Sequence, residues 1–332
     1  MSDARILTEA LRDPATVAGL DAEGWTALLT IARAEQLIGT LAHRLAGLPM
    51  PAAAARVLAD ARASAEQGRI AALWEAEMAR RALADTDMPV ILLKGTAYAA
   101  AGLGAATGRS IGDLDILVPR ARLDEAEALL LAAGWEWVKP DPYDDLYYRR
   151  WMHELPPLIH HERDRMIDVH HTILPLTARI TPDADALITD SEVLESGLRI
   201  LAPHDRICHA AAHLFADGDL AGGLRNLWDV HCLAVEADIA ALEARAAHHG
   251  LQVAVARALR LADTLYGSGI HAGQEETGSD RWYLRRLLAR DCWGRPTRKL
   301  MRLGFYVRSH WLRMPPTLLV QHLFKKWRKG VA

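Results

Sequence analysis

The 332-residue chain has little cysteine and few aromatic residues. Its three cysteines, Cys208, Cys232 and Cys292, are odd in number and widely separated, without the paired spacing of a zinc site or a disulfide framework. Aromatic residues make up only 6% of the chain, whereas alanine inflates the apolar fraction of 51%. This composition favours helix over most of the length, because alanine and leucine are strong helix formers.

Long hydrophobic runs are also missing. No apolar run approaches the roughly 18 residues that are needed to span a bilayer. The first residues, Met1–Arg5, lead into a charged helix and not into an apolar signal segment. We therefore expect no transmembrane segment and a cytoplasmic location.

Acidic residues are nearly absent from one end of the chain, although the net charge is only -3. Between Arg281 and Ala332 there are 14 lysines and arginines but a single acid, Asp291. Within this basic segment, Pro316–Lys329 combines an apolar helical face with clustered lysines. Such sequence suits an anionic membrane surface or the backbone of a nucleic acid such as RNA. The alternative is that the basic segment packs on the acidic remainder of the chain.

The order of helical and strand-like segments predicts an α+β fold with three regions. These are an N-terminal helical region (1–88), a small mixed-sheet core (89–200) and a C-terminal helical domain that carries the basic segment (201–332). The expected helices are Ile6–Leu11, Trp25–Leu45, Ala52–Ala84, Arg122–Ala133, His204–Phe215, Leu220–Val235, Ile239–His248 and Leu251–Tyr266. The expected strands are Val90–Leu93, Asp113–Val118, Trp135–Lys139, Tyr147–Trp151, His153–His161 and Met166–His170. Trp74 is expected to pack in the core, with a base-stacking platform as the alternative.

Two carboxylates lie side by side in the strand Asp113–Val118. Side chains of a strand point alternately to its two faces, so Asp113 and Asp115 share one face. Close carboxylates repel each other unless a cation sits between them, and their burial without one is costly. The economical interpretation is a magnesium site.

A turn of sequence Lys94-Gly95-Thr96 ends the preceding apolar strand. Gly95 lets the backbone approach a ligand, and Thr96 can begin a helix whose free N–H groups attract phosphate. Together with the two carboxylates, this turn indicates metal-assisted chemistry on a nucleotide.

These motifs resemble a known family. The order of Leu93–Thr96, Arg109 and Gly112–Val118 is similar to that of the uncharacterised bacterial nucleotidyltransferase family in the DNA polymerase beta superfamily. That superfamily carries a third carboxylate on a later strand, and Asp168 stands at the matching position. Further on, a histidine segment followed by Leu224–Asp229 is similar to the family's Leu-Arg-x-Leu-x-Asp pattern. The resemblance covers about residues 90–235 and implies a polymerase-beta-like nucleotidyltransferase core.

The resemblance also implies roles for individual residues. It makes Asp113, Asp115 and Asp168 the catalytic residues and the ligands of two Mg²⁺ ions. The nucleotide-binding positions that it implies are Lys94, Gly95, Thr96, Arg109, Gly112 and His170. Lys94 and Arg109 would balance the charge of the triphosphate, and the alternative for each is a structural ion pair. His170 would orient the acceptor or a metal-bound water, and packing is the alternative.

The implied reaction transfers a nucleoside monophosphate from an NTP, with ATP expected, to a hydroxyl of an acceptor that the sequence does not identify. One alternative is a non-catalytic nucleotide-binding or interaction module. Another is an RNA-modifying enzyme of toxin–antitoxin type, in which the basic segment would bind the RNA. Two pairs with helical spacing, His209 with His213 and Arg225 with Asp229, are expected to be a hydrogen-bonded pair and an ion pair.

Overall fold

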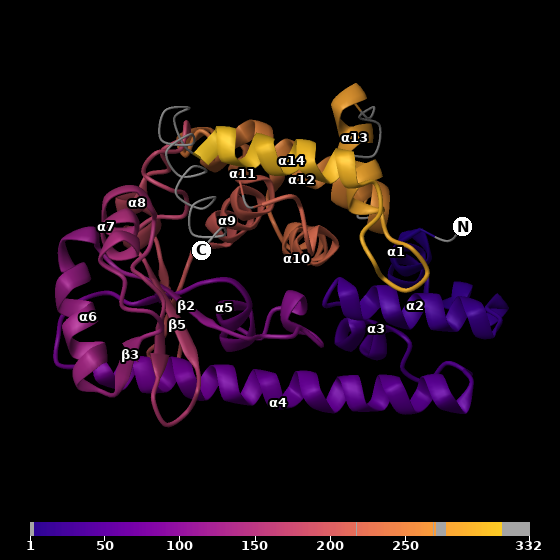
Figure 1. Ribbon diagram of the computed structural model, residues 1–332, viewed down its shortest axis with the longest axis horizontal. Helices are drawn as coiled ribbons and strands as arrows, with labels where there is room; N and C mark the ends of the chain where they lie inside the picture. Colours follow the sequence, from indigo (N-terminus) through magenta and orange to yellow (C-terminus); the bar gives the residue numbers. More distant parts are fainter. Residues whose placement is uncertain (1–2, 217, 268, 270–276, 314–332) are drawn as a thin grey trace, which may run out of the picture.

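The computed structural model describes residues 3–216, 218–267, 269 and 277–313. It confirms the α+β fold class: helices surround a single mixed sheet of seven strands (Figure 1). Its strands are β1 (Ile91–Leu92), β2 (Leu114–Leu117), β3 (Trp135–Trp137), β4 (Leu158–His160), β5 (Met166–His170), β6 (Glu192–Val193) and β7 (Arg199–Ile200). Their order in the sheet is β3-β4-β5-β2-β1-β7-β6. The pairs β2–β5 and β1–β7 are parallel and the others antiparallel, so the two acidic strands β2 and β5 are direct neighbours.

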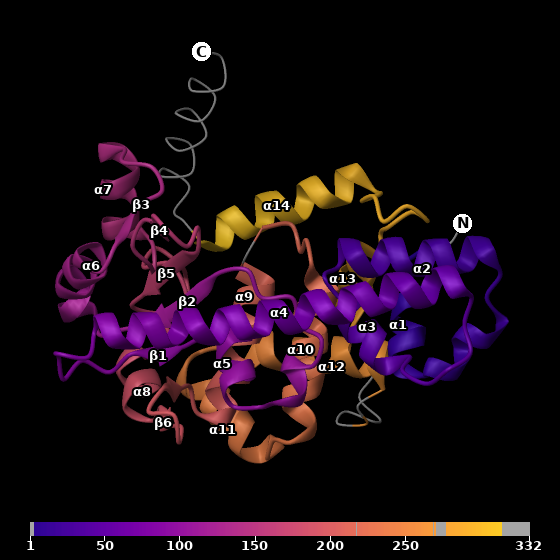
Figure 2. The same ribbon diagram turned by 90° about the horizontal axis from the view of Figure 1, so that it is seen from below.

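The N-terminal helices are α1 (Arg5–Arg12), α2 (Ala22–Ala34), α3 (Ile38–Arg44) and α4 (Ala52–Ala82). The prediction of one helix over Trp25–Leu45 was wrong, because Gln36 adopts a left-handed conformation (φ 55°) that ends α2 and redirects the chain. Helix α4 runs beneath the molecule from α3 to the sheet (Figures 1 and 2). It packs mainly through alanines, while Trp74 is 56% exposed, so core packing of Trp74 was also wrong.

Two segments predicted as strands differ from the expectation. Tyr147–Trp151 belongs to helix α7 (Pro142–Trp151), not to a strand. This helix begins at Pro142, and the Asp141 side chain caps it by accepting hydrogen bonds from the first free N–H groups. The strand expected at His153–His161 is limited to β4, with one isolated bridge between Glu154 and His170.

The remaining helices are α5 (Lys94–Ala100), α6 (Leu123–Ala132), α8 (Ala184–Thr189), α9 (Pro203–Ala216), α10 (Gly223–Val235), α11 (Ile239–His248), α12 (Gln252–Tyr266), α13 (Gly278–Leu287) and α14 (Lys299–Arg313). Of these, α5 and α6 lie on either side of the sheet in Figure 1, and those from α8 to α14 lie higher than the labelled strands. The N-terminal helices contact the segment that follows α13, because the Ala4 N–H donates to the Leu288 carbonyl and the Thr30 hydroxyl donates to the Cys292 carbonyl. Among the described residues, no helix is both long and apolar enough to cross a lipid bilayer.

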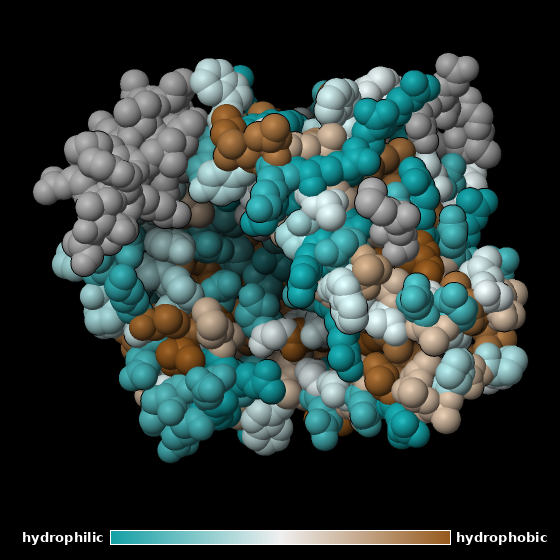
Figure 3. Space-filling view, turned by 45° about the vertical axis from the view of Figure 1, so that its right-hand side comes forward, coloured by the Kyte–Doolittle hydropathy of each residue, from teal (hydrophilic) through white to brown (hydrophobic). Residues whose placement is uncertain are grey.

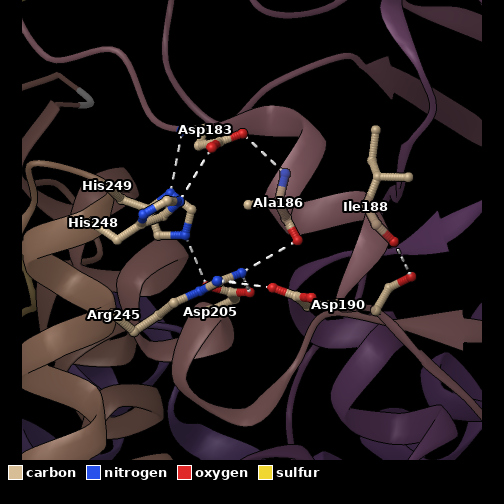
Figure 4. Close-up of polar contacts among 9 residues, drawn as sticks. Asp183, Ala186, Ile188, Asp190, Asp205, Arg245, His248 and His249 are labelled. Atoms are coloured by element: carbon tan, nitrogen blue, oxygen red, sulfur yellow. Dashed lines mark hydrogen bonds and ion pairs between the residues drawn. The ribbon is translucent and has the colours of Figure 1, made fainter.

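A buried charge network joins α8, α9 and α11 (Figure 4). Asp205, fully buried on α9, accepts two hydrogen bonds of 2.6 Å from Arg245, and the His249 ring nitrogen Nε2 lies 3.0 Å from it. Burial would raise the pKa of Asp205, but the hydrogen bonds from His249 and Arg245 lower it. Arg245 also contacts the Ala186 carbonyl and Asp190. The network fixes α9, which carries His209 and His213 toward the cleft described below.

The described part of the basic segment contacts acids elsewhere in the chain. Arg290 pairs with Glu35 at 2.7 Å, and both Arg286 and Arg302 pair with Asp219. These are contacts expected if the basic segment packs on the remainder of the chain. The amphipathic stretch predicted at Pro316–Lys329 lies outside the described residues.

Candidate active site

The parallel pairing of β2 and β5 brings two carboxylates face to face. In this register Asp115 lies directly opposite Asp168, and Asp113 precedes Asp115 by two residues. One carboxylate oxygen from each of the three residues lies within 4.8 Å of the others. Like charges directly opposite each other destabilise a sheet unless they are compensated. The structure thus assembles the three acids that the sequence singles out, in an arrangement that can hold a divalent cation.

Asp115 is the buried member of this acidic cluster, with 3% of the residue exposed. Its oxygen Oδ1 lies 2.7 Å from Lys94 Nζ and 3.0 Å from His170 Nε2. Burial would raise the pKa of Asp115, but Lys94 and His170 hold it well below its usual range. Asp115 is therefore ionised at neutral pH.

Asp168 has the opposite electrostatic environment. Burial raises the pKa of Asp168 to about 7, and the neighbouring charges of Asp115 and Glu154 add to this effect. Among the described residues, no cationic side chain donates a hydrogen bond to Asp168. The cluster therefore lacks positive charge at Asp168, and its oxygen ligands are those that a hard divalent cation prefers.

The Lys94-Gly95-Thr96 turn forms the start of helix α5, two residues earlier than expected. Lys94 adopts a left-handed backbone conformation (φ 49°), which is unusual for a residue with a side chain. This conformation accompanies the ion pair of Lys94 with Asp115. Gly95 and Thr96 are buried, and Gly112 is exposed in the segment that leads into β2.

Arg109 lies in a buried network beside α5. Its Nη1 is 2.7 Å from Asp229 Oδ2, and its guanidinium lies over the Tyr98 ring. Asp229 also accepts a hydrogen bond of 2.9 Å from Arg225, which confirms the ion pair expected on α10. A Cβ atom added to Gly95 would lie only 2.5 Å from Arg109 Nε. The missing side chain of Gly95 therefore makes room for Arg109.

We expect Gly95→Ala to lower the free energy of unfolding by about 1–3 kcal/mol, since the new methyl group must displace a buried, paired guanidinium. Urea denaturation measures this loss. Gly112→Ala is the matched control, because an added Cβ at Gly112 meets no atom within 4 Å. Equal stability of the two variants would contradict the packing role of Gly95.

A cleft of about 310 Å³ opens over the acidic cluster. Its walls include Lys94, Asp113 and Asp168, together with His153 and Glu154 from the segment between α7 and β4, and His213 from α9. Figure 3 shows a hollow with mainly hydrophilic walls on one side of the molecule.

Glu154 and His153 did not emerge as site residues from the sequence. They reach the cleft because their segment pairs with β5 through the bridge between Glu154 and His170. No local sequence pattern marks this pairing.

Two further histidines lie near the cleft on α9. His209 is buried, and its ring contacts that of His213 edge to face with 6.4 Å between the centroids. Burial, together with the charge of nearby Lys94, lowers the pKa of His209 well below its usual range. His209 is therefore neutral at neutral pH.

Comparison with known proteins gives one family. A sequence model of the family described as "Uncharacterised nucleotidyltransferase" matches residues 21–267, which include the whole sheet, the acidic cluster and helices α9 and α10. The resemblance stated from the motifs is thereby confirmed at the level of the family. No curated protein matches the chain.

Proposed function

This chain belongs to the uncharacterised nucleotidyltransferase family, and from that premise we propose that it transfers a nucleoside monophosphate from an NTP to a hydroxyl of an acceptor. ATP is the expected NTP and Mg²⁺ the expected metal. The observation that carries the proposal is the cluster of Asp113, Asp115 and Asp168 at the cleft, with Asp115 and Asp168 paired across parallel strands.

The three carboxylates fit Mg²⁺ because they supply only oxygen ligands and leave the charge of Asp168 uncompensated. When bound, two such ions would stabilise the attacking and leaving oxygens of an in-line displacement. Both protein contacts of Asp115 go to Oδ1, so Oδ2 is the oxygen that we assign to metal binding.

Lys94 is the residue that we assign to the triphosphate. Its side chain is 26% exposed and lines the cleft, and its ammonium group pairs with Asp115. A metal ion bound by Asp115 would compensate that charge, which would leave the Lys94 ammonium group free to contact phosphate oxygens. His170 keeps its hydrogen bond to Asp115 and holds that carboxylate in its orientation.

Arg109 receives a different assignment. Its guanidinium is paired with Asp229 in the buried network and packs on Gly95. We therefore propose that Arg109 positions the α5 turn and does not contact the triphosphate.

Labelled nucleotides test the proposed reaction. The purified protein is incubated with Mg²⁺, each of the four NTPs and fractions of a cell extract that contain RNA, protein or small molecules. Label from the α-phosphate is expected in an acceptor, because the transferred nucleoside monophosphate carries that phosphate, whereas label from the γ-phosphate is not. Transfer of γ-label would contradict nucleotidyl transfer. Binding of NTP without any transfer in all fractions would favour a non-catalytic module.

A further inference from the structure

A second group of metal-binding side chains lies next to the acidic cluster. His153, Glu154 and His170 each offer one ligand atom, and these atoms lie within 4.8 Å of one another. Glu154 Oε2 is 3.3 Å from His170 Nδ1 and 3.6 Å from His153 Nε2. Two imidazole nitrogens and one carboxylate oxygen thus converge on one point at the wall of the cleft.

The backbone holds this group in place. His153 and Glu154 precede β4, and the Glu154–His170 bridge ties their segment to β5. The His171 N–H donates to the His153 carbonyl at 2.8 Å, and the Leu155 N–H to the Val169 carbonyl at 2.9 Å. Convergence of the three side chains is therefore a product of sheet pairing and not of a chance loop conformation.

The hydrogen bonding of His170 points to a cation at this place. The His170 side chain is only 3% exposed, and its Nε2 faces Asp115 Oδ1 at 3.0 Å. A carboxylate only accepts, so Nε2 carries the hydrogen that faces Asp115, and Nδ1 is the ring nitrogen on the side of Glu154. Within the described residues Nδ1 has no hydrogen-bond partner, and it faces the Glu154 carboxylate. A buried ring nitrogen that has no hydrogen-bond partner and lies 3.3 Å from a carboxylate oxygen is placed to share a cation with that oxygen.

The ligand types indicate which cations fit. Imidazole nitrogens suit zinc, cobalt and other first-row transition metals, whereas Mg²⁺ takes oxygen ligands. A histidine that binds such a metal usually donates its other ring N–H to a carboxylate, which fixes the ring. Asp115 occupies that place for His170. Because His153 and Glu154 line the cleft, a metal bound here keeps access to small molecules.

We propose that His153, Glu154 and His170 form a transition-metal site for Zn²⁺ or a similar ion, separate from the three aspartates and linked to them through the hydrogen bond of His170 to Asp115. A metal bound at this site fixes the orientation of the His170 ring. Through its hydrogen bond to Asp115, the ring in turn fixes the orientation of that carboxylate in the acidic cluster. This inference stands apart from the proposed nucleotidyl transfer, because metal binding requires neither nucleotide nor turnover.

Metal titration of the full chain tests the site. The purified protein is treated with a chelator, dialysed, and titrated with Co²⁺ or Zn²⁺ in excess Mg²⁺, which fills oxygen-only sites. Visible absorption of bound Co²⁺ reports nitrogen ligands, and elemental analysis gives the amount of zinc bound. One zinc ion per chain is the expected result. Glu154→Gln and His153→Asn should each weaken binding by about 100-fold or more, since each removes a ligand.

Asp113→Asn is the matched control, since Asp113 belongs only to the acidic cluster. This variant should bind Zn²⁺ as the wild type does, and thermal melts of all variants establish that they are folded. His153→Asn alone decides the outcome if Glu154→Gln does not fold. Absence of zinc binding by the wild type would overturn the proposal, and so would unchanged binding in His153→Asn or loss of binding in Asp113→Asn. Failure of the α-label experiment would leave this result unaffected.

Discussion

Asp168→Asn is expected to abolish nucleotidyl transfer and, in metal-free protein at pH 8, to raise stability. Turnover should fall by about 1,000-fold or more, because an amide replaces a carboxylate that we assign to the metal acting in the transition state. Affinity for the NTP should change far less than turnover, since a group that acts mainly in the transition state contributes little to ground-state binding.

The gain in stability follows from the raised pKa of Asp168, about 7 in the folded protein against a usual value of 3.8. Well below pH 3.8 the carboxyl is protonated in both the folded and the unfolded chain and makes no difference. As the pH rises toward 7 the unfolded chain loses the proton first, so the folded wild type loses stability. Above pH 7 the loss is complete and on the order of 4 kcal/mol. The amide of the Asp168→Asn variant carries no charge at any of these pH values, so the variant does not suffer this loss.

Thermal melts at pH 4 and pH 8, with chelator or with Mg²⁺, measure this effect. The variant should melt well above the wild type at pH 8 with chelator and almost equally at pH 4, and Mg²⁺ should stabilise only the wild type. Asp113→Asn is the control. Asp113 is exposed, so its variant should lose turnover with little change in the melt. A lower melting temperature of Asp168→Asn at pH 8 would show that the Asp168 carboxylate stabilises the metal-free fold, which contradicts an uncompensated charge at this position.

The acidic cluster was predictable from sequence because its geometry is largely local. Alternation along one strand places Asp113 beside Asp115, and the same rule places Asp168 and His170 on one face of β5. The feature that the sequence did not predict is the parallel register of β2 and β5, which places Asp168 opposite Asp115. Within a short strand, alternation alone determines which side chains share a face. Such a motif can therefore be interpreted before the rest of the fold is known.

Residues whose partners are distant in sequence were not predictable in the same way. Arg109 lies four residues before Asp113, yet its partner Asp229 is on α10. Glu154 reaches the cleft only through pairing with β5. The helix at Pro142–Trp151 shows a local error instead, because its aromatic residues favour strand while the Asp141 cap and Pro142 begin a helix.

The buried network of Arg109, Arg225 and Asp229 gives the second large expected effect. Asp229→Asn should lower the free energy of unfolding by about 3–5 kcal/mol, because it leaves two buried guanidinium groups without a compensating charge. Arg225 is 3% and the Arg109 side chain 13% exposed, so water cannot replace the carboxylate. Glu236→Gln, an exposed acid at the end of the same helix, should change stability by no more than about 0.5 kcal/mol.

Arg109→Lys separates the two roles considered for Arg109. If Arg109 belongs to the network, the variant loses the geometry of the guanidinium beside Asp229 and Tyr98, and the free energy of unfolding falls by about 1–3 kcal/mol. NTP affinity of the folded protein then stays within about threefold of the wild type, a difference in binding free energy of less than about 1 kcal/mol. A contact with the triphosphate predicts the reverse, weaker binding with an unchanged melt. Urea denaturation and calorimetric titration of NTP with Mg²⁺, on the same preparation, decide whether the cation four residues before the acidic strand serves the substrate or the fold.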